Sequence, residues 1–232
     1  MVSSPEFSFL QMADRLPLVK LIELGYELCG TYSLPTEADP EPPERGFYYR
    51  KPLSSTGKLN AFVARMPGAR GRKKAIRALR YLIDGSASPM ETKLSILLTL
   101  PYLLGGFGLF MPELNSRIIP AKTAKRASSK AHYVCDLFWP DYNLAVEYDS
   151  DQHHTGSAQI AEDSKKRNAL NVMGITVITV TKQQLYRSAE LEKVARVLAN
   201  CMDKRLKYRN PGFATAHREL RSQLFGQQQL TR

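Results

Sequence analysis

The stretch from Val134 to Val180 constrains the fold of this chain more than any other part of it. It contains two short apolar segments separated by residues 140–143, whose Pro-Asp-Tyr-Asn sequence is typical of a tight turn. Segments rich in aromatic and β-branched residues on both sides of a turn predict a β-hairpin. The first segment carries one carboxylate, Asp136, and the second carries two, Glu147 and Asp149.

The residues after this hairpin extend it into an α/β domain. They predict a helix from about Ser157 to Gly174, and then a buried strand over 175–180, where β-branched residues are frequent. Asp163 and Arg167 are four residues apart within the helix, which is the spacing of a surface ion pair. We therefore expect an α/β fold with a central mixed sheet flanked by helices.

Shifts in composition divide the chain into three parts. Residues 1–66 predict a small, mainly helical N-terminal unit with an acidic, proline-rich linker at 34–46. Residues 67–210 contain the α/β domain. Residues 211–232 are polar, and we expect little order in this C-terminal tail unless a partner holds it.

The charge balance of the chain favours a polyanionic partner. Lys and Arg number 33 against 22 Asp and Glu, which gives a formal net charge of +11, and such a field favours a polyanion such as nucleic acid, or an anionic surface, as partner. A predicted basic helix near residue 70 and a basic loop before the hairpin are candidate phosphate contacts. A solvated helix face and a flexible hairpin tip explain the same charges. The candidate nucleic-acid-binding residues are Arg70, Lys73, Arg77, Lys122, Lys125, Arg126 and Lys130.

Cysteine usage and the apolar segments predict a cytoplasmic protein without a membrane partner. Cys29, Cys135 and Cys201 are odd in number and show neither a disulfide pattern nor a zinc spacing. The residues from Met1 to Phe9 lack the basic start and apolar run of a secretion signal. Proline and glycine residues interrupt the uncharged stretch from Leu94 to Met111, which predicts a buried helix and a glycine loop rather than a membrane span.

The carboxylates of the predicted hairpin are candidate ligands of a divalent metal ion. Alternation places Glu147 and Asp149 on one face of the second strand, and pairing in register brings Asp136 close to them. Such a cluster is costly unless it is protonated or neutralised by a cation. Oxygen ligands suit Mg²⁺ or Mn²⁺, which polarises a phosphoryl oxygen and activates water. Alternatively, this face of the hairpin is exposed and its acids are merely solvated.

Two further residues near this cluster have chemical potential. His153 follows Asp149 by four positions, in a loop at the strand end, where a histidine can serve as general base, general acid or ligand. Glu91 occupies the third position of a predicted helix that begins after Ser88, and N-terminal capping is a sufficient explanation for an acid there.

The order of these residues resembles the PD-(D/E)XK nuclease superfamily. Within it, the chain resembles the branch of very-short-patch-repair endonucleases and their small bacterial relatives over roughly residues 88–184. The resemblance implies a restriction-endonuclease-like core. The motifs that carry it are Asp136-Leu-Phe-Trp-Pro, Leu144-Ala-Val-Glu147-Tyr-Asp149, His153, Asp163-x-x-x-Arg167, Leu170, and Gly174 followed by the strand to Val180.

Carried over by position, the resemblance makes Asp136 and Glu147 the paired metal ligands and Glu91 the acid on the preceding helix. Asp149 and His153 match the aspartate and histidine that this branch shows after its second strand. The zinc site of the repair enzymes is not found in this sequence, so their mismatch specificity is not inherited.

The sequence departs from the superfamily where a lysine is usual, because Asp149 stands at that position. The water-activating role then falls to His153 or to Lys165 or Lys166 of the following helix. The candidate catalytic residues are Glu91, Asp136, Glu147, Asp149, His153 and Lys165.

These observations predict an endonuclease that uses Mg²⁺ or Mn²⁺ to hydrolyse DNA phosphodiester bonds. One alternative keeps the fold without the chemistry: a DNA-binding, regulatory module of a defence or toxin–antitoxin system, since fold does not guarantee activity. The other is an RNA nuclease. The sequence leaves the oligomeric state open.

Overall fold

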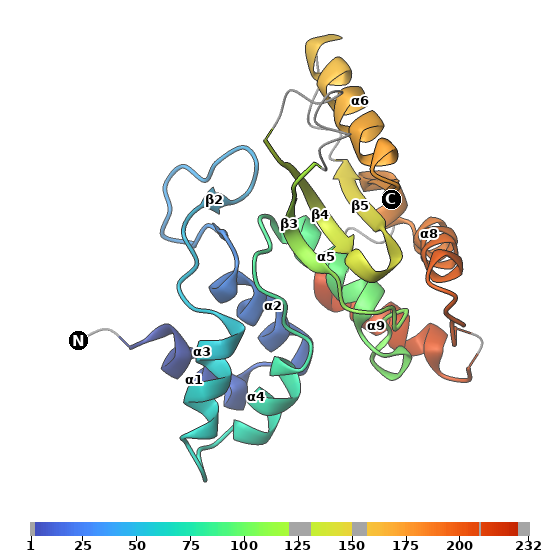
Figure 1. Ribbon diagram of the computed structural model, residues 1–232. Coiled ribbons are helices and arrows are strands. Elements are labelled where there is room, and N and C mark those ends of the chain that lie inside the picture. The colour runs from blue at the N-terminus through green and yellow to red at the C-terminus, as the bar shows by residue number, and fades with distance from the viewer. Residues whose placement is uncertain (1–2, 121–130, 150–156, 209, 227–232) are drawn as a thin grey trace. The chain divides into compact units, whose positions relative to one another are not determined.

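The computed structural model describes residues 3–120, 131–149, 157–208 and 210–226, the side chains of 157–160 excepted, and it divides the chain into two compact units (Figure 1). The first unit comprises Met1–Phe110 together with Lys207–Arg232, and the second comprises Met111–Leu206. This division differs from the predicted boundaries at 66 and 210. The composition shift after residue 66 marks a loop within the first unit and not its end.

The first unit is mainly helical. Helices α1 to α4 pack against one another, and Phe9, Leu21, Ile22 and Leu59 are completely buried. The short strands β1 (Tyr32–Ser33) and β2 (Tyr48–Tyr49) form an antiparallel ribbon. The helices are α1 (Pro5–Arg15), α2 (Leu18–Cys29), α3 (Thr56–Ala64), α4 (Arg72–Leu79), α5 (Pro89–Thr99), the 3-10 turn η1 (Tyr102–Leu104) and α9 (Phe213–Phe225).

Serine caps fix where three of these helices begin. Ser4, Ser55 and Ser88 precede α1, α3 and α5, and each hydroxyl accepts the backbone N–H three residues further on. These bonds satisfy donors that the first helical turn leaves without a partner, and each contributes about 1 kcal/mol of stability. The predicted start of a helix after Ser88 is confirmed.

The C-terminal region forms a buried helix, so the predicted polar tail is wrong for residues 213–225. Phe213, His217, Leu220 and Leu224 recur at helical spacing and are buried on one face of α9. Exposed Thr215, Arg218 and Glu219 on the other face, together with the buried Arg221, give this segment the polar composition that concealed the apolar stripe. Helix α9 therefore belongs to the core of the first unit.

A glycine allows α9 to approach η1 closely. Gly105 has a φ of +86°, and a Cβ added there would lie 2.3 Å from the carbonyl oxygen of Ala216. The Nδ1 atom of His217 lies 2.6 Å from the carbonyl oxygen of Gly105. Only a residue without a side chain fits this contact and this backbone conformation.

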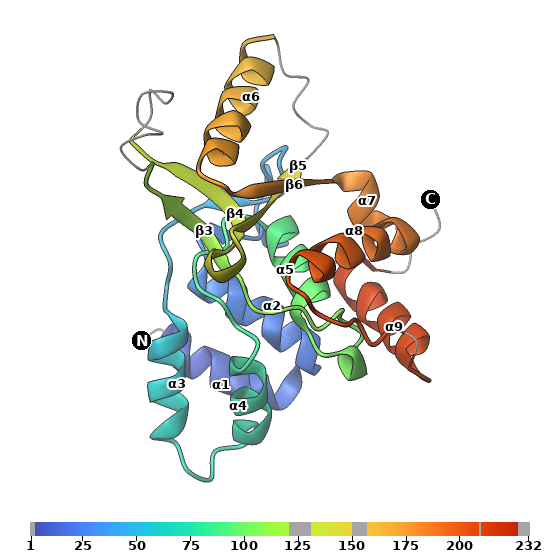
Figure 2. The ribbon, with the colours of Figure 1, turned by 45° about the vertical axis from the view of Figure 1, so that its right-hand side comes forward.

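The second unit is built on a mixed four-stranded sheet of order β3-β4-β5-β6, in which only β5 and β6 are parallel. The predicted α/β class with a mixed central sheet is confirmed. Figure 2 shows α6 and α8 on opposite sides of this sheet. The elements are β3 (Glu113–Ile118), β4 (Tyr133–Trp139), the turn η3 (Pro140–Tyr142), β5 (Leu144–Asp149), α6 (Ser157–Val172), β6 (Thr176–Thr181), α7 (Lys182–Tyr186) and α8 (Ser188–Cys201).

Local sequence explains the connections of this sheet. Asn143 closes the β4–β5 turn with a φ of +45°, a left-handed conformation that asparagine tolerates better than most residues. Thr181 and Gln184 form a complete capping box at the start of α7. Cys135 and Ala145 pack against Leu170 of α6, which anchors that helix on one face of the sheet.

None of the helices within the described ranges is long and apolar enough to cross a membrane. The uncharged stretch from Leu94 to Met111 is divided between α5, which ends at Thr99, and a loop in which Gly105 and Gly108 have positive φ. This division agrees with the predicted helix and glycine loop.

The contact between η1 and α9 predicts an unequal cost for alanine at two glycines. Gly105→Ala should lower the free energy of unfolding by about 2–4 kcal/mol, because it adds the left-handed strain of an L-residue to a backbone clash. Gly68 has a φ of +81° with nothing within 4 Å of its added Cβ, so Gly68→Ala should cost only about 1–2 kcal/mol. Urea denaturation of both variants measures the difference, and equal costs would exclude a tight contact at Gly105.

Candidate functional site

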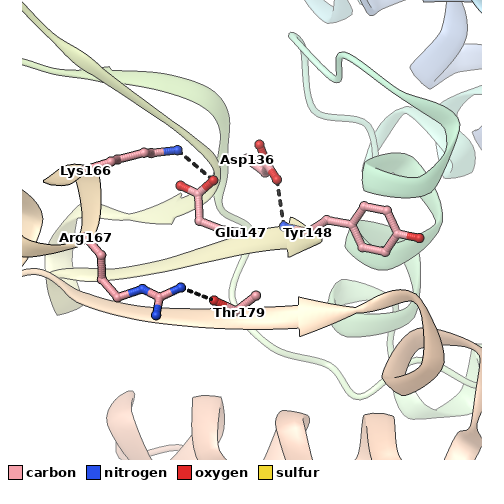
Figure 3. A network of polar contacts seen from close by, with 6 residues as sticks. All are labelled: Asp136, Glu147, Tyr148, Lys166, Arg167 and Thr179. Carbon is pink, nitrogen blue, oxygen red and sulfur yellow. Dashed lines mark hydrogen bonds and ion pairs between the residues drawn. The ribbon is translucent and has the colours of Figure 1, made fainter. Parts of the chain in front are cut away.

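Asp136 lies where strands β4 and β5 diverge. Their paired residues are 137–139 on β4 and 144–146 on β5. Beyond them, the backbone N–H of Tyr148 donates to Oδ2 of Asp136 at 2.7 Å (Figure 3). The Asp136 carboxylate therefore accepts the hydrogen bond that the Tyr148 N–H would otherwise donate to a backbone carbonyl of the neighbouring strand. Because its acceptor is ionised, this bond is stronger than an ordinary strand hydrogen bond.

Glu147 is the neighbour of Tyr148, so the same end of the hairpin holds a second carboxylate. Its Oε2 atom lies 2.7 Å from Nζ of Lys166, and the Glu147 and Lys166 side chains are 22% and 26% exposed. Its Oε1 atom is buried and has no hydrogen-bond partner in the described part of the chain. Glu147 thus keeps one oxygen that is shielded from solvent and able to accept a further ligand.

Cys135 lies beside the carboxylate of Glu147. Burial raises the pKa of the Cys135 thiol, and the negative charge of Glu147 raises it further. The thiol therefore stays protonated at neutral pH and is unreactive as a nucleophile or metal ligand. This agrees with Cys135 as a buried residue of the core.

Arg167 donates from Nη2 to Oγ1 of Thr179 at 3.2 Å. Thr179 is the register partner of Glu147 on β6, so α6 delivers two consecutive cations, Lys166 and Arg167, to neighbouring strands (Figure 3). The spacing of Asp163 and Arg167 predicted a surface ion pair, and the contact shown for Arg167 is with Thr179 of β6. No sequence pattern indicated it, because the contact depends on how α6 crosses the sheet.

The remaining predicted catalytic residues lie in different surroundings. Asp149 is exposed at the end of β5. The Lys165 side chain is 71% exposed and pairs with Glu162 at 3.1 Å, so Lys166 and not Lys165 is the lysine that contacts Glu147. His153 lies outside the described residues.

Glu91 belongs to the first unit, where it has a capping role. The backbone N–H of Ala87 donates to its Oε2 at 2.9 Å, and its own N–H donates to Ser88. The residue is 8% exposed. These bonds fit the capping explanation that the sequence offered for Glu91.

Asp136 and Glu147 fit part of the coordination shell of a hard divalent cation. Mg²⁺ is commonly bound through one or two carboxylates, with water and phosphate oxygens as its other ligands, and the shielded Oε1 of Glu147 is a donor of the right type. In the part of the chain that the structure describes, no group of three or more His, Cys, Asp or Glu side chains is placed to hold a metal ion. A metal at this position would therefore take its other ligands from outside this pair.

The basic residues of α4 divide into structural and exposed ones. Nζ of Lys74 donates to the carbonyl of Leu16 at 2.8 Å, beyond the C-terminal end of α1, and Nε of Arg72 donates to the carbonyl of Val63 at 3.1 Å. The predicted nucleic-acid contacts Arg70, Lys73 and Arg77 are exposed, as is Arg80. The other predicted contacts, Lys122, Lys125, Arg126 and Lys130, lie outside the described residues.

No family model and no solved structure match the chain. It is similar to two curated Mycobacterium tuberculosis proteins named only as uncharacterized, MT2308 of strain CDC 1551 and Rv2248 of strain ATCC 25618. Each is 26% identical over 142 residues, which cover 61% of this chain and 47% of the relative. The match thus spans about half the length of these relatives, and their names assign no activity.

The Lys166–Glu147 contact predicts a measurable coupling. Lys166→Met leaves a mostly buried carboxylate without its counter-ion and should lower the free energy of unfolding by about 1–3 kcal/mol. Adding Glu147→Gln should recover most of this loss in a double-mutant cycle followed by urea denaturation. Lys165→Met, which breaks an exposed pair, should change stability by less than about 0.5 kcal/mol. A cycle without coupling would mean that the two side chains do not interact.

Proposed function

We propose that this protein is a divalent-metal-dependent nuclease that hydrolyses DNA phosphodiester bonds. The observation that carries this proposal is that Asp136, which binds the Tyr148 amide, and Glu147, which pairs with Lys166, lie at the same diverging end of β4 and β5 (Figure 3). Two carboxylates and an ammonium group are the residue types needed to bind a hard cation, stabilise a phosphoryl group and orient an attacking water. The resemblance to PD-(D/E)XK nucleases assigns the same two acids as metal ligands.

The contacts of each side chain position it for one role in this chemistry. Asp136 is held in place by the Tyr148 amide, which fixes one metal ligand before substrate arrives. Glu147 offers its shielded Oε1 to the cation while Oε2 stays near Lys166. Mg²⁺ or Mn²⁺, when bound there, polarises a phosphoryl oxygen and lowers the pKa of a bound water.

Lys166 replaces the lysine that the superfamily places on its second strand. Asp149 stands at that strand position, whereas Lys166 reaches Glu147 from α6 at 2.7 Å. Its ammonium orients the attacking water and offsets the negative charge that gathers at the phosphate. The lysine function is therefore supplied from a helix, which explains why the strand can carry an aspartate.

DNA as the substrate is supported by charge. The chain carries a formal net charge of +11; Lys73 and Arg77 are exposed on α4, which contains no acidic residue, and Arg70 is exposed just before it. Exposed cations spaced along one helix contact successive phosphates of a nucleic-acid backbone.

A DNA-binding module without catalysis is the second candidate. One observation favours it: the ammonium of Lys166 already neutralises Glu147, so a metal ion must compete with a resident charge. In such a module Asp136 and Lys166 serve to hold the sheet and α6 together, and the basic residues alone provide the function.

Substitution of the two acids separates these candidates. Asp136→Ala and Glu147→Ala should each reduce Mg²⁺- or Mn²⁺-dependent cleavage of plasmid and linear duplex DNA at least about 10²-fold, because each removes a metal ligand worth several kcal/mol of transition-state stabilisation. DNA affinity in EDTA should stay within about threefold, since neither acid neutralises phosphate. Glu190→Ala, which removes an exposed partner of Lys193 on α8, is the control.

Lys166→Ala belongs in the same assay and should lower cleavage by about 10²-fold while metal binding persists, as expected for loss of a group that moves or orients a proton. Matched RNA of the same sequence tests the RNA alternative. If folded wild-type protein cuts neither nucleic acid with either metal, the nuclease proposal fails and the binding module remains.

The exposed cations of α4 should set the salt dependence of DNA binding. The double variant Lys73→Ala/Arg77→Ala should reduce the slope of log affinity against log salt concentration by about two, one for each lost phosphate contact. Fluorescence anisotropy with a labelled duplex at several salt concentrations measures this slope. Lys193→Ala, an exposed lysine paired with Glu190, should leave it unchanged. An unaltered slope in the double variant would place the DNA elsewhere.

A further inference from the structure

Arg167 is a cation beside the candidate metal site that the proposed chemistry leaves unused. Thr179 and Glu147 are register partners on parallel strands, so their side chains project from the same face of the sheet, about 5 Å apart. The hydroxyl of Thr179 accepts a hydrogen bond from Arg167 at 3.2 Å. The guanidinium is thereby placed one strand away from the carboxylate of Glu147 (Figure 3).

The contact with Thr179 orients the guanidinium without neutralising it. A guanidinium has five N–H donors, and a threonine hydroxyl takes one of them while adding no charge. Arg167 is exposed, and in the described part of the chain it has no carboxylate partner. Its remaining donors are therefore available to an anion.

Other cations on the helices of this unit are used differently. Lys165, Lys193 and Arg196 each pair with a glutamate three or four positions away on their own helix. Such pairs are ordinary surface contacts, in which a glutamate on the same helix neutralises the positive charge. Arg167 instead contacts the neutral hydroxyl of Thr179 on β6. Glu147, which pairs with Lys166, lies on the adjacent strand.

We propose that Arg167 binds a non-bridging oxygen of the DNA phosphate that lies at the Asp136–Glu147 pair, and that Thr179 positions its guanidinium. This inference rests on the proposed function and adds the residue that holds the substrate. A planar fork of donors matches two phosphate oxygens better than an ammonium does. Held at the reacting phosphate, it also stabilises the charge that develops there during hydrolysis.

Three substitutions separate the effects of the Arg167 charge, of its paired guanidinium donors and of its orientation by Thr179. Arg167→Gln removes the charge and should weaken binding of a labelled duplex in EDTA about tenfold and lower its salt slope by about one. Arg167→Lys keeps the charge and should leave the slope unchanged while kcat falls, because the fork is lost. Thr179→Val keeps the arginine and should lower kcat with little change in KM. Lys193→Gln, the same charge change at an exposed site on α8, is the control.

The outcomes for this residue and for the nuclease are distinguishable. Wild-type binding affinity, salt slope and kcat/KM in Arg167→Gln would overturn the role of Arg167 and leave the nuclease intact. A wild-type protein that binds DNA but never cuts it overturns the nuclease, and the salt slope of Arg167→Gln still decides the phosphate contact. A wild-type protein that does not bind DNA overturns both. Circular dichroism and urea denaturation of Arg167→Lys and Arg167→Gln check that any loss does not come from unfolding.

Discussion

The hydrogen bond from the Tyr148 amide to the Asp136 carboxylate is the contact on which the candidate site depends. Strand pairing between β4 and β5 ends at Leu137 and Val146, and an amide left open beyond that point would cost free energy. The carboxylate satisfies it at 2.7 Å and fixes the acid on β4 beside the acid on β5. One bond thus stabilises the open end of the hairpin and fixes the position of one acid of a possible metal-binding pair.

Helix α6 completes the site through packing and charge together. Ala169 and Leu170 bury the helix against Cys135 and Ala145, and this contact brings Lys166 within reach of Glu147. Cys135 is buried in this apolar contact beside Glu147, and burial keeps the pKa of its thiol raised. Because apolar contacts already hold the helix against the sheet, Lys166 and Arg167 can serve a ligand in addition to the contacts they make with β5 and β6.

The sequence predicted the sheet well and the site only in part. The Pro140–Asn143 turn and the β-branched strand after Gly174 are local signals, and both elements formed where expected. The sequence could not show whether Lys165 or Lys166 contacts Glu147, because the side chains of consecutive helical residues project about 100° apart and the rotation of α6 was not known. The contact of Arg167 with Thr179 was also hidden, since two elements far apart in sequence make it. In α9, polar residues on one face masked the apolar stripe on the other.

The first unit is discontinuous: it takes residues up to Phe110 and then Lys207 onward. During synthesis, all residues of the sheet unit are made before α9, the helix that packs beside Gly105. The apolar core of the helical unit is therefore incomplete until α9 has been synthesised, whereas all residues of the sheet unit are available for folding earlier. A chain truncated before residue 213 would keep every residue of the sheet unit and lack only the helix that completes the apolar core of the first unit.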